Sequence, residues 1–155
     1  MQVRKWMTRS VVTIGPQDSL SRARHLLEEH RIDQLPVVVE GKLVGLLTLR
    51  DLQNAFESVC EVAGRSPGAG PFGQLTVDAV MTPHVLTVQP DDSILYAAHL
   101  LRRERIGCLP VVEGSRLVGI ITRRDLLFAF MQSFEAGSGK NSAPEAEPYA
   151  EAPRV

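Results

Sequence analysis

One pattern of apolar and polar positions occurs twice along this chain. In each copy a short run rich in β-branched residues, VVTI at 11–14 and VLTV at 85–88, precedes a turn that contains proline. Such runs predict short β-strands. Ser19 and Ser93, or the aspartate before each, then stand where the N-cap of a helix is expected. Apolar residues at helical spacing follow each cap: Leu20, Ala23 and Leu27 in the first copy, and Ile94, Ala97 and Leu101 in the second.

Two further β-rich runs follow each of these helices. In the first copy LPVVV and LVGLLT are joined through Glu40 and Gly41, and in the second LPVVE and LVGIIT are joined through Gly114 and Ser115. Two-residue connections that contain glycine are typical of tight β-hairpins. A second helix is expected after each hairpin, from the spacing of Leu52, Ala55, Phe56 and Val59 and, in the second copy, of Leu126, Ala129, Phe130 and Phe134.

The two copies form an internal repeat. A shift of 74 residues, from Met7 to Met81, aligns residues 7–56 with 81–130 without a gap. A unit of roughly 50 residues buries too little surface to be stable alone, so we expect the two copies to share a core. The predicted class is α/β (α+β): two β-α-β-β-α repeats packed as a pseudo-two-fold pair, each a small sheet with two helices. We assign residues 1–62 to repeat 1, 63–74 to a Gly/Pro-rich linker, 75–134 to repeat 2 and 135–155 to a disordered tail.

Composition narrows the classes of function. The chain has 155 residues, of which 44% are hydrophobic, and a formal net charge of −1, so it lacks the basic excess typical of nucleic-acid binding. No secretory signal is found, and no apolar run approaches the roughly 20 residues of a membrane span. We therefore expect a cytoplasmic protein with no membrane or nucleic-acid partner. Cys60 and Cys108 have neither CxxC nor zinc-ligand spacing, so no disulfide framework or metal site is predicted.

Three motifs carry a family resemblance. Each copy has an M-T-x-x-V-x-T opening, an L-P-V-V centre and a G-h-h-T-x-x-D close, where h is apolar. From residue 7 to about 134, the chain resembles a tandem pair of CBS domains, named after cystathionine β-synthase and called a Bateman module. The resemblance implies a regulatory module without catalysis, whose clefts between the repeats take AMP, ADP, ATP or S-adenosylmethionine. It implies no required cofactor and no catalytic residue, although Mg²⁺ can accompany the nucleotide.

The resemblance also implies which residues line the clefts. The first cleft would contain Leu46, Thr48, Arg50, Asp51, Pro83, His84, Val85, Ile106, Gly107 and Cys108. The second would contain Arg9, Ser10, Val11, Ile32, Asp33, Gln34, Ile120, Thr122, Arg124 and Asp125. Carboxylates such as Asp51 and Asp125 suit the two hydroxyls of a ribose, and Arg50 and Arg124 suit a phosphate.

Two motifs can also be explained by local structure instead of ligand binding. Thr-x-x-Asp before an apolar helix is also a capping box variant, in which the threonine caps the helix and the aspartate returns to the backbone N–H of the cap. Gly45 and Gly119 either leave room for a flat base or mark a bulge or a close approach of backbone.

The loops of the two clefts differ in charge. Asp33 and Gln34 offer the second cleft an acid that repels phosphate, whereas Gly107 and Cys108 offer the first cleft room and no opposing charge. We therefore expect the first cleft to bind an adenine nucleotide better, and the second to bind weakly, to bind a less phosphorylated ligand or to stay empty.

The predicted function is that of a sensor of energy state or metabolites. The chain would bind an adenosine compound, form a homodimer through its second helices and signal by a conformational change to an unidentified output protein. The alternative is a ligand-independent dimeric scaffold. An enzyme is not expected, because no nucleophile with an adjacent base, acid/base carboxylate pair or metal cluster is found.

Overall fold

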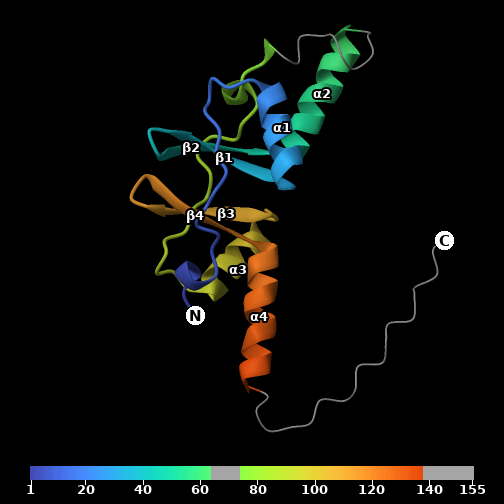
Figure 1. Cartoon of the computed structure of the whole chain (residues 1–155). Helices are drawn as coiled ribbons and strands as arrows, with labels where there is room; N and C mark the ends of the chain where they lie inside the picture. The colour runs from blue at the N-terminus through green and yellow to red at the C-terminus, as the bar shows by residue number, and fades with distance from the viewer. Residues whose placement is uncertain (64–73, 138–155) are drawn as a thin grey trace, which may run out of the picture.

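The computed structural model describes residues 1–63 and 74–137 (Figure 1). Repeat 1 contains α1 (Leu20–His30), β1 (Gln34–Val39), β2 (Lys42–Thr48) and α2 (Leu49–Ala63). Repeat 2 contains α3 (Ile94–Arg103), β3 (Cys108–Glu113), β4 (Arg116–Thr122) and α4 (Arg123–Gly137). Short 3-10 turns, η1 (Val3–Lys5) and η3 (Val77–Ala79), lie in the opening segments. The expected fold class and the two repeats are confirmed.

Local signals in the sequence explain the first helices. The Ser19 hydroxyl accepts a hydrogen bond from the Arg22 N–H, and the Ser93 hydroxyl accepts one from the Tyr96 N–H, so both serines are N-caps as expected. Leu20, Ala23 and Leu27 are buried on one face of α1, as the apolar spacing predicts.

The strands form one antiparallel sheet in the order β1-β2-β4-β3. Both hairpin turns contain residues with positive φ, as tight turns of this kind require. These are Glu40 (49°) and Gly41 (77°) in the first hairpin and Gly114 (64°) in the second. The repeats meet in the middle of this sheet, where Lys42 pairs with Arg116.

The expected first strands are reduced to single bridges. Ile14 pairs with Val37 and Val88 with Val111, both in the parallel sense. The chain turns immediately after each bridge, and in the first copy the Gly15 N–H is donated to the Asp18 carboxylate instead of to a strand. The runs at 11–14 and 85–88 are therefore not regular strands.

The opening segments of the repeats are exchanged. Figure 1 shows the N-terminal segment beside α3, while the segment that follows the linker lies beside α1. Val3 and Met7 belong to the core of repeat 2, which is built on Leu109, Val111 and Ile121. Val77 belongs in turn to the core of repeat 1, where Met81 packs against the buried residues. Each core is thus completed by the other repeat, a form of sharing that the repeat pattern had not specified.

The exchanged segments explain the strand glycines. A Cβ on Gly119 would lie 2.7 Å from the Met7 sulfur, and a Cβ on Gly45 would lie 2.5 Å from the Met81 sulfur. The space beside each glycine is therefore filled by a methionine of the other repeat. The interpretation of these glycines as a slot for a base is wrong, and both structural alternatives hold: the other repeat approaches closely, and the strand register shifts beside each glycine.

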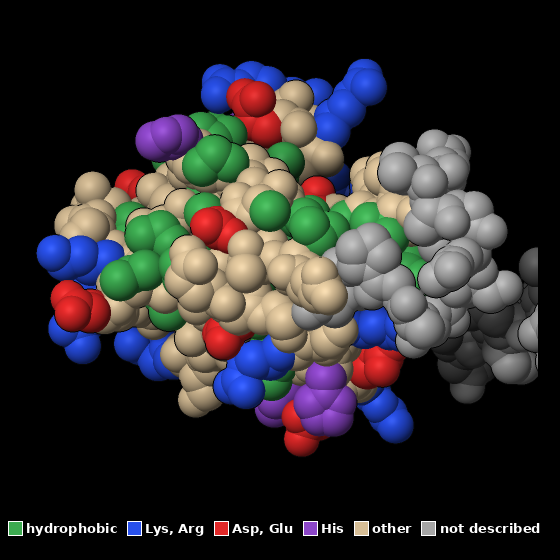
Figure 2. Space-filling view, turned by 90° about the horizontal axis from the view of Figure 1, so that it is seen from above, with side chains coloured by type: hydrophobic (Ala, Val, Ile, Leu, Met, Phe, Trp, Pro, Cys, Tyr) green, Lys and Arg blue, Asp and Glu red, His purple; other side chains and the backbone are tan. Residues whose placement is uncertain are grey.

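The assigned ends of the repeats need one correction. Helix α4 continues to Gly137, so residues 135–137, assigned above to the tail, are helical. Residues 64–73 of the linker and 138–155 of the tail lie outside the described residues. Within the described ranges, none of the helices has the length and apolar content of a membrane span. Basic and acidic side chains are interspersed on the face shown in Figure 2, which presents no continuous basic stripe.

A double-mutant cycle tests the exchange. Gly119→Ala should lower the free energy of unfolding by about 1–3 kcal/mol, because the new methyl group overpacks against Met7. In a Met7→Ala background the same substitution should cost about 1 kcal/mol less, since the obstructing sulfur is gone. Urea denaturation measures both values.

The matched control uses the methionine of the other copy. Gly119→Ala and Met81→Ala should be additive, because Met81 packs on Gly45. Coupling of Gly119 to Met81 in place of Met7 would show that the segments are not exchanged.

Candidate functional site

Two cavities lie between the repeats. One of about 570 Å³ contains every residue expected in the first cleft except Pro83. One of about 420 Å³ contains every residue expected in the second cleft except Arg9. These volumes fall within the range of about 300–1,000 Å³ that is usual for small-molecule sites. Whether these residues bind a ligand stays a prediction, but the structure does bring them together.

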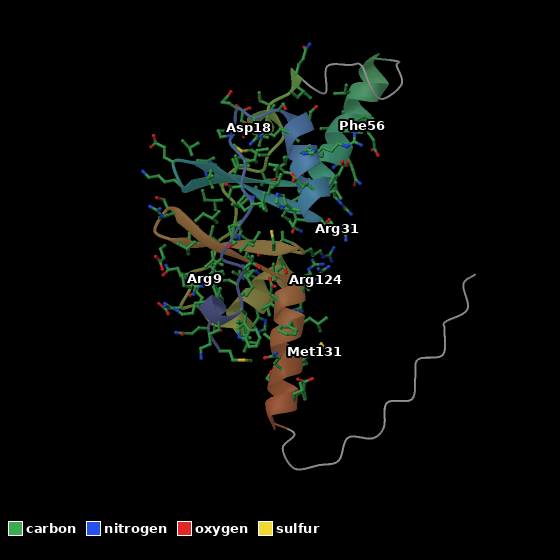
Figure 3. All side chains as sticks on the ribbon, in the orientation of Figure 1. Arg9, Asp18, Arg31, Phe56, Arg124 and Met131 are labelled. Atoms are coloured by element: carbon green, nitrogen blue, oxygen red, sulfur yellow. The ribbon has the colours of Figure 1, made fainter. Side chains whose placement is uncertain are left out.

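The two exceptions lie elsewhere. Pro83 is exposed and does not line the first cleft. Arg9 lines a separate small hollow with Gly41 and Val118, and its guanidinium donates a hydrogen bond to the Arg4 carbonyl. Figure 3 shows Arg9 on the side of the molecule opposite Arg31 and Arg124.

Several lining residues were not anticipated. The first cleft also contains Gln34, Thr82, Leu86, Glu104 and Arg105. The second also contains Thr8, Val12, Arg31, Gly107 and Arg123. Gln34 and Gly107 line both cavities, and a Cβ on Gly107 would lie 3.3 Å from the Gln34 amide nitrogen. The two clefts therefore share a wall.

The segment exchange builds the clefts. The Thr8 N–H donates to the Ile120 carbonyl at 2.9 Å and the Ile120 N–H donates back to Thr8 at 3.0 Å. The same reciprocal pair joins Thr82 and Leu46. Each opening segment is thereby held against the strand that leads into the Thr-x-x-Asp motif of the other repeat. This contact places Ser10 and Val11 in one cavity with Thr122 and Asp125.

The Thr-x-x-Asp motifs do cap their helices. The Asp51 carboxylate oxygen Oδ2 accepts hydrogen bonds from the Thr48 N–H at 2.8 Å and the Thr48 hydroxyl at 2.7 Å. The Asp51 N–H donates in turn to the Thr48 hydroxyl at 3.2 Å. Thr122 and Asp125 repeat this arrangement. The capping box interpretation is therefore confirmed.

The capping bonds occupy only one oxygen of each carboxylate. The bonds that each carboxylate accepts all end on Oδ2, and among the described residues no hydrogen bond reaches Oδ1 of Asp51 or Asp125. Both aspartates are half-buried and line their cavities. Each motif thus fixes the orientation of a carboxylate while leaving one oxygen available at a cleft.

Two arginines that the sequence analysis missed occupy equivalent positions, Arg31 in the second cleft and Arg105 in the first. Each adopts left-handed backbone just after the first helix of its repeat, with φ of 52° and 55°. The next N–H closes the helix end, from Ile32 to Leu27 and from Ile106 to Leu101. Glycine is the usual residue at this position. An arginine at this position in both copies was therefore the sequence signal that could have indicated these two cleft residues.

The expected charge contrast between the clefts is wrong. The first cleft contains Glu104, so it does carry an acid besides Asp51, and Arg103 pairs with that glutamate at 2.6 Å. The second cleft contains Arg31 and Arg123 in addition to the expected Arg124. The loop residues at 33–34 and 107–108 alone did not reveal these side chains, because helix ends supply them.

Cys108 is a packed residue. It is 2% exposed, and burial raises the pKa of its thiol to about 12. Its thiolate, the reactive form, is therefore scarce at neutral pH. Among the described residues no group of His, Cys, Asp and Glu is arranged to hold a metal ion.

Comparison with known proteins identifies the repeats. The family described as CBS domain matches residues 3–58 and 77–132. The chain is 33% identical over 136 residues to the CBS domain-containing protein YhcV of Bacillus subtilis, covering 88% of this chain and 90% of that protein. It is 36% identical over 124 residues to the inosine-5'-monophosphate dehydrogenase of Korarchaeum cryptofilum, covering 79% of this chain but 23% of that enzyme.

Solved structures agree with this match. The CBS domain pair of protein MJ0100, in complex with 5'-methylthioadenosine and S-adenosyl-L-methionine, has a TM-score of 0.73 and 27% identity, covering 86% of this chain and 98% of that one. CBSX2 in complex with AMP has a TM-score of 0.72 and 28% identity, with the same two coverages.

The protection of Cys108 can be tested by alkylation. In a Cys60→Ser variant, iodoacetamide at pH 8 should leave native protein unlabelled, because a thiol pKa of about 12 leaves almost no thiolate. Mass spectrometry measures the label. The same protein in concentrated urea should be labelled readily, and fast labelling of native protein would contradict the burial of Cys108.

Proposed function

Because the chain belongs to the CBS domain family, we propose that it is a regulatory module that binds an adenosine-containing ligand in the clefts between its repeats. The observation that carries the proposal is the pair of capping aspartates, Asp51 and Asp125, each of which lines a cavity and has one carboxylate oxygen that no described residue bonds. AMP, ADP, ATP and S-adenosylmethionine are the candidate ligands, and the relatives of known structure that bind AMP or S-adenosylmethionine support this choice.

The capping bonds support a role in holding ribose. Thr48 fixes the orientation of the Asp51 carboxylate before any ligand arrives, so little side-chain entropy is lost on binding. An ionised carboxylate accepts hydrogen bonds from two neighbouring hydroxyls and makes stronger bonds than a neutral acceptor. The aspartate therefore serves the helix with Oδ2 and the sugar with Oδ1.

The remaining walls suit the rest of a nucleoside. Val85 and Ile106 offer apolar surface in the first cleft, and Val11 and Ile32 take the equivalent places in the second. Arginines accompany them in both cavities and supply donors for a phosphate. No cofactor is needed for this role, and Mg²⁺ can enter with a nucleotide.

Binding between the repeats provides a route to regulation. Because each cavity is lined by both repeats, a ligand that prefers one relative arrangement of the repeats shifts the population toward it. The shift is limited by the difference in affinity, typically about 1–3 kcal/mol. In this proposal the module acts in the cytoplasm on an output protein, and it performs no catalysis itself.

The second helix of repeat 2 supports a homodimer. Its outer face carries five large apolar residues that are 54% to 62% exposed: Leu127, Phe128, Phe130, Met131 and Phe134. Phe130 and Phe134 stack edge to face, with ring centroids 4.8 Å apart. In α2 the positions equivalent to Leu127, Phe128 and Met131 are Gln53, Asn54 and Glu57. The α4 face, made of the five residues above, is thus our proposed contact with a second copy.

Ligand binding is tested with Asp51→Asn. Asparagine keeps an acceptor for the Thr48 N–H, so the helix stays capped, but the ionised oxygen offered to the ribose is lost. The affinity of the first cleft for AMP, ADP, ATP or S-adenosylmethionine should fall at least about tenfold. Isothermal titration calorimetry measures this, and thermal shift shows whether wild-type protein is stabilised by the ligand.

A capping variant outside the clefts separates affinity from stability. Ser93→Ala should cost about 1 kcal/mol of stability by removing the α3 cap and should leave ligand affinity unchanged. If wild-type protein shows no saturable binding of any of the four compounds, the ligand-independent scaffold is the better description.

The dimer is tested with equivalent substitutions in the two repeats. Leu127→Glu should convert a dimer to a monomer at micromolar concentration, because a charge on the α4 face would have to be desolvated in the contact. Gln53→Glu adds the same charge at the equivalent place on α2 and should leave the dimer intact. Sedimentation velocity measures the species, and a monomeric wild-type protein would refute the proposed contact.

A further inference from the structure

The second cleft has an excess of guanidinium groups. Arg31 reaches it from the end of α1 in repeat 1, and Arg123 and Arg124 reach it from the first turn of α4 in repeat 2. Figure 3 shows Arg31 and Arg124 on the same side of the molecule, at the level where the repeats meet. Cations from both repeats therefore converge on one cavity.

Comparison of positions 74 residues apart isolates the difference between the clefts. Arg31 corresponds to Arg105, and Arg124 corresponds to Arg50, so each cleft has these two arginines. Arg123 corresponds instead to Leu49, which lies in a groove against α1 and not in the first cleft. The third guanidinium is thus the cationic feature that the first cleft lacks.

These charges have no acidic partner within the described ranges. In the described part of the chain, none of the three arginines forms an ion pair. The Arg123 Nε–H donates to the Ile106 carbonyl at 2.9 Å, a neutral acceptor that leaves its charge uncompensated while fixing its place. The acids in this cavity are Asp125, which is held by Thr122, and Asp33.

The first cleft is less favourable to a chain of phosphates. It has two arginines and His84 against Asp51 and Glu104. Each cleft has one acid besides its capping aspartate, Glu104 in the first and Asp33 in the second, so repulsion by acids acts in both and the third arginine makes the difference. Adding phosphates should therefore strengthen binding in the second cleft more than in the first.

We propose that the second cleft is the site for a nucleoside di- or triphosphate and that Arg123 is the residue that determines this preference. The inference rests on the proposed function, since it assumes that the clefts take adenosine compounds. Arginine suits the role because its planar fork binds phosphate oxygens in pairs. A phosphate chain held between Arg31 of one repeat and Arg123 and Arg124 of the other links the repeats directly.

The test measures how affinity depends on phosphate number. Adenosine, AMP, ADP and ATP are titrated calorimetrically into Asp51→Asn protein, which reports mainly on the second cleft, in EDTA so that no Mg²⁺ shares the phosphate charge. ATP should bind at least about tenfold more tightly than AMP. Adding Arg123→Leu, which copies the residue of repeat 1, should reduce the ATP-to-AMP ratio about tenfold while AMP affinity changes less than about threefold.

Arg102→Leu is the matched control. Arg102 is exposed on α3, lines neither cleft and forms no ion pair with a described residue, so its loss changes net charge equally without touching the site. The ATP-to-AMP ratio should stay unchanged. Melting temperatures of both variants verify that they are folded.

The outcomes separate the two proposals. Equal affinities for AMP and ATP, or an equal loss of both in Arg123→Leu, would overturn the role of Arg123 and leave the adenosine module standing. If Arg102→Leu lowers the ATP-to-AMP ratio as much as Arg123→Leu does, the preference for ATP reflects net charge alone. That result would also overturn the role of Arg123. If wild-type protein binds none of these four compounds, this inference fails; if it also fails to bind S-adenosylmethionine, the proposed function fails with it.

Discussion

Neither repeat of this protein contains all of its own core. The segment that opens repeat 1 supplies Val3 and Met7 to repeat 2, and the segment that opens repeat 2 supplies Val77 and Met81 to repeat 1. Separating the repeats would expose these residues on both sides, so the molecule is held together by the same contacts that complete its cores. Glycine is needed at 45 and 119 for this reason, because the methionines lie where a side chain would begin.

The clefts follow from this exchange. An opening segment must cross from one repeat to the other, and its reciprocal hydrogen bonds, Thr8 with Ile120 and Thr82 with Leu46, set it beside the strand that leads into a Thr-x-x-Asp motif. The aspartate of that motif then faces a cavity with walls from both repeats. Its two oxygens differ in their surroundings, since one is bonded to the cap and the other accepts no hydrogen bond from the residues that the structure describes. The Thr-x-x-Asp cap that stabilises the helix thereby also orients the carboxylate of the candidate site.

The sequence predicted the helices and the hairpins well, but not that the runs at 11–14 and 85–88 form only single bridges. Apolar spacing, Ser19 and Ser93 indicated the first helices, and the two-residue turns indicated the hairpins, because these signals depend on neighbouring residues. It could not predict the exchange, since Val3 and Val77 are apolar whichever core they enter. The cleft arginines were missed for a similar reason: Arg31 and Arg123 lie at helix ends, and only the folded chain shows that these ends meet at one cavity. The charge contrast drawn from Asp33 and Gly107 failed because it considered the loops alone.

The wall between the clefts has its own consequence. Gln34 and Gly107 border both cavities, with the glutamine amide against the glycine, so a molecule that shifts this amide in one cavity changes the shape of the other. Thermodynamic linkage then makes the influence mutual, and each occupant alters the affinity for the other by the same factor. If both cavities were occupied, the binding of each ligand would depend on the concentration of the other as well as on its own.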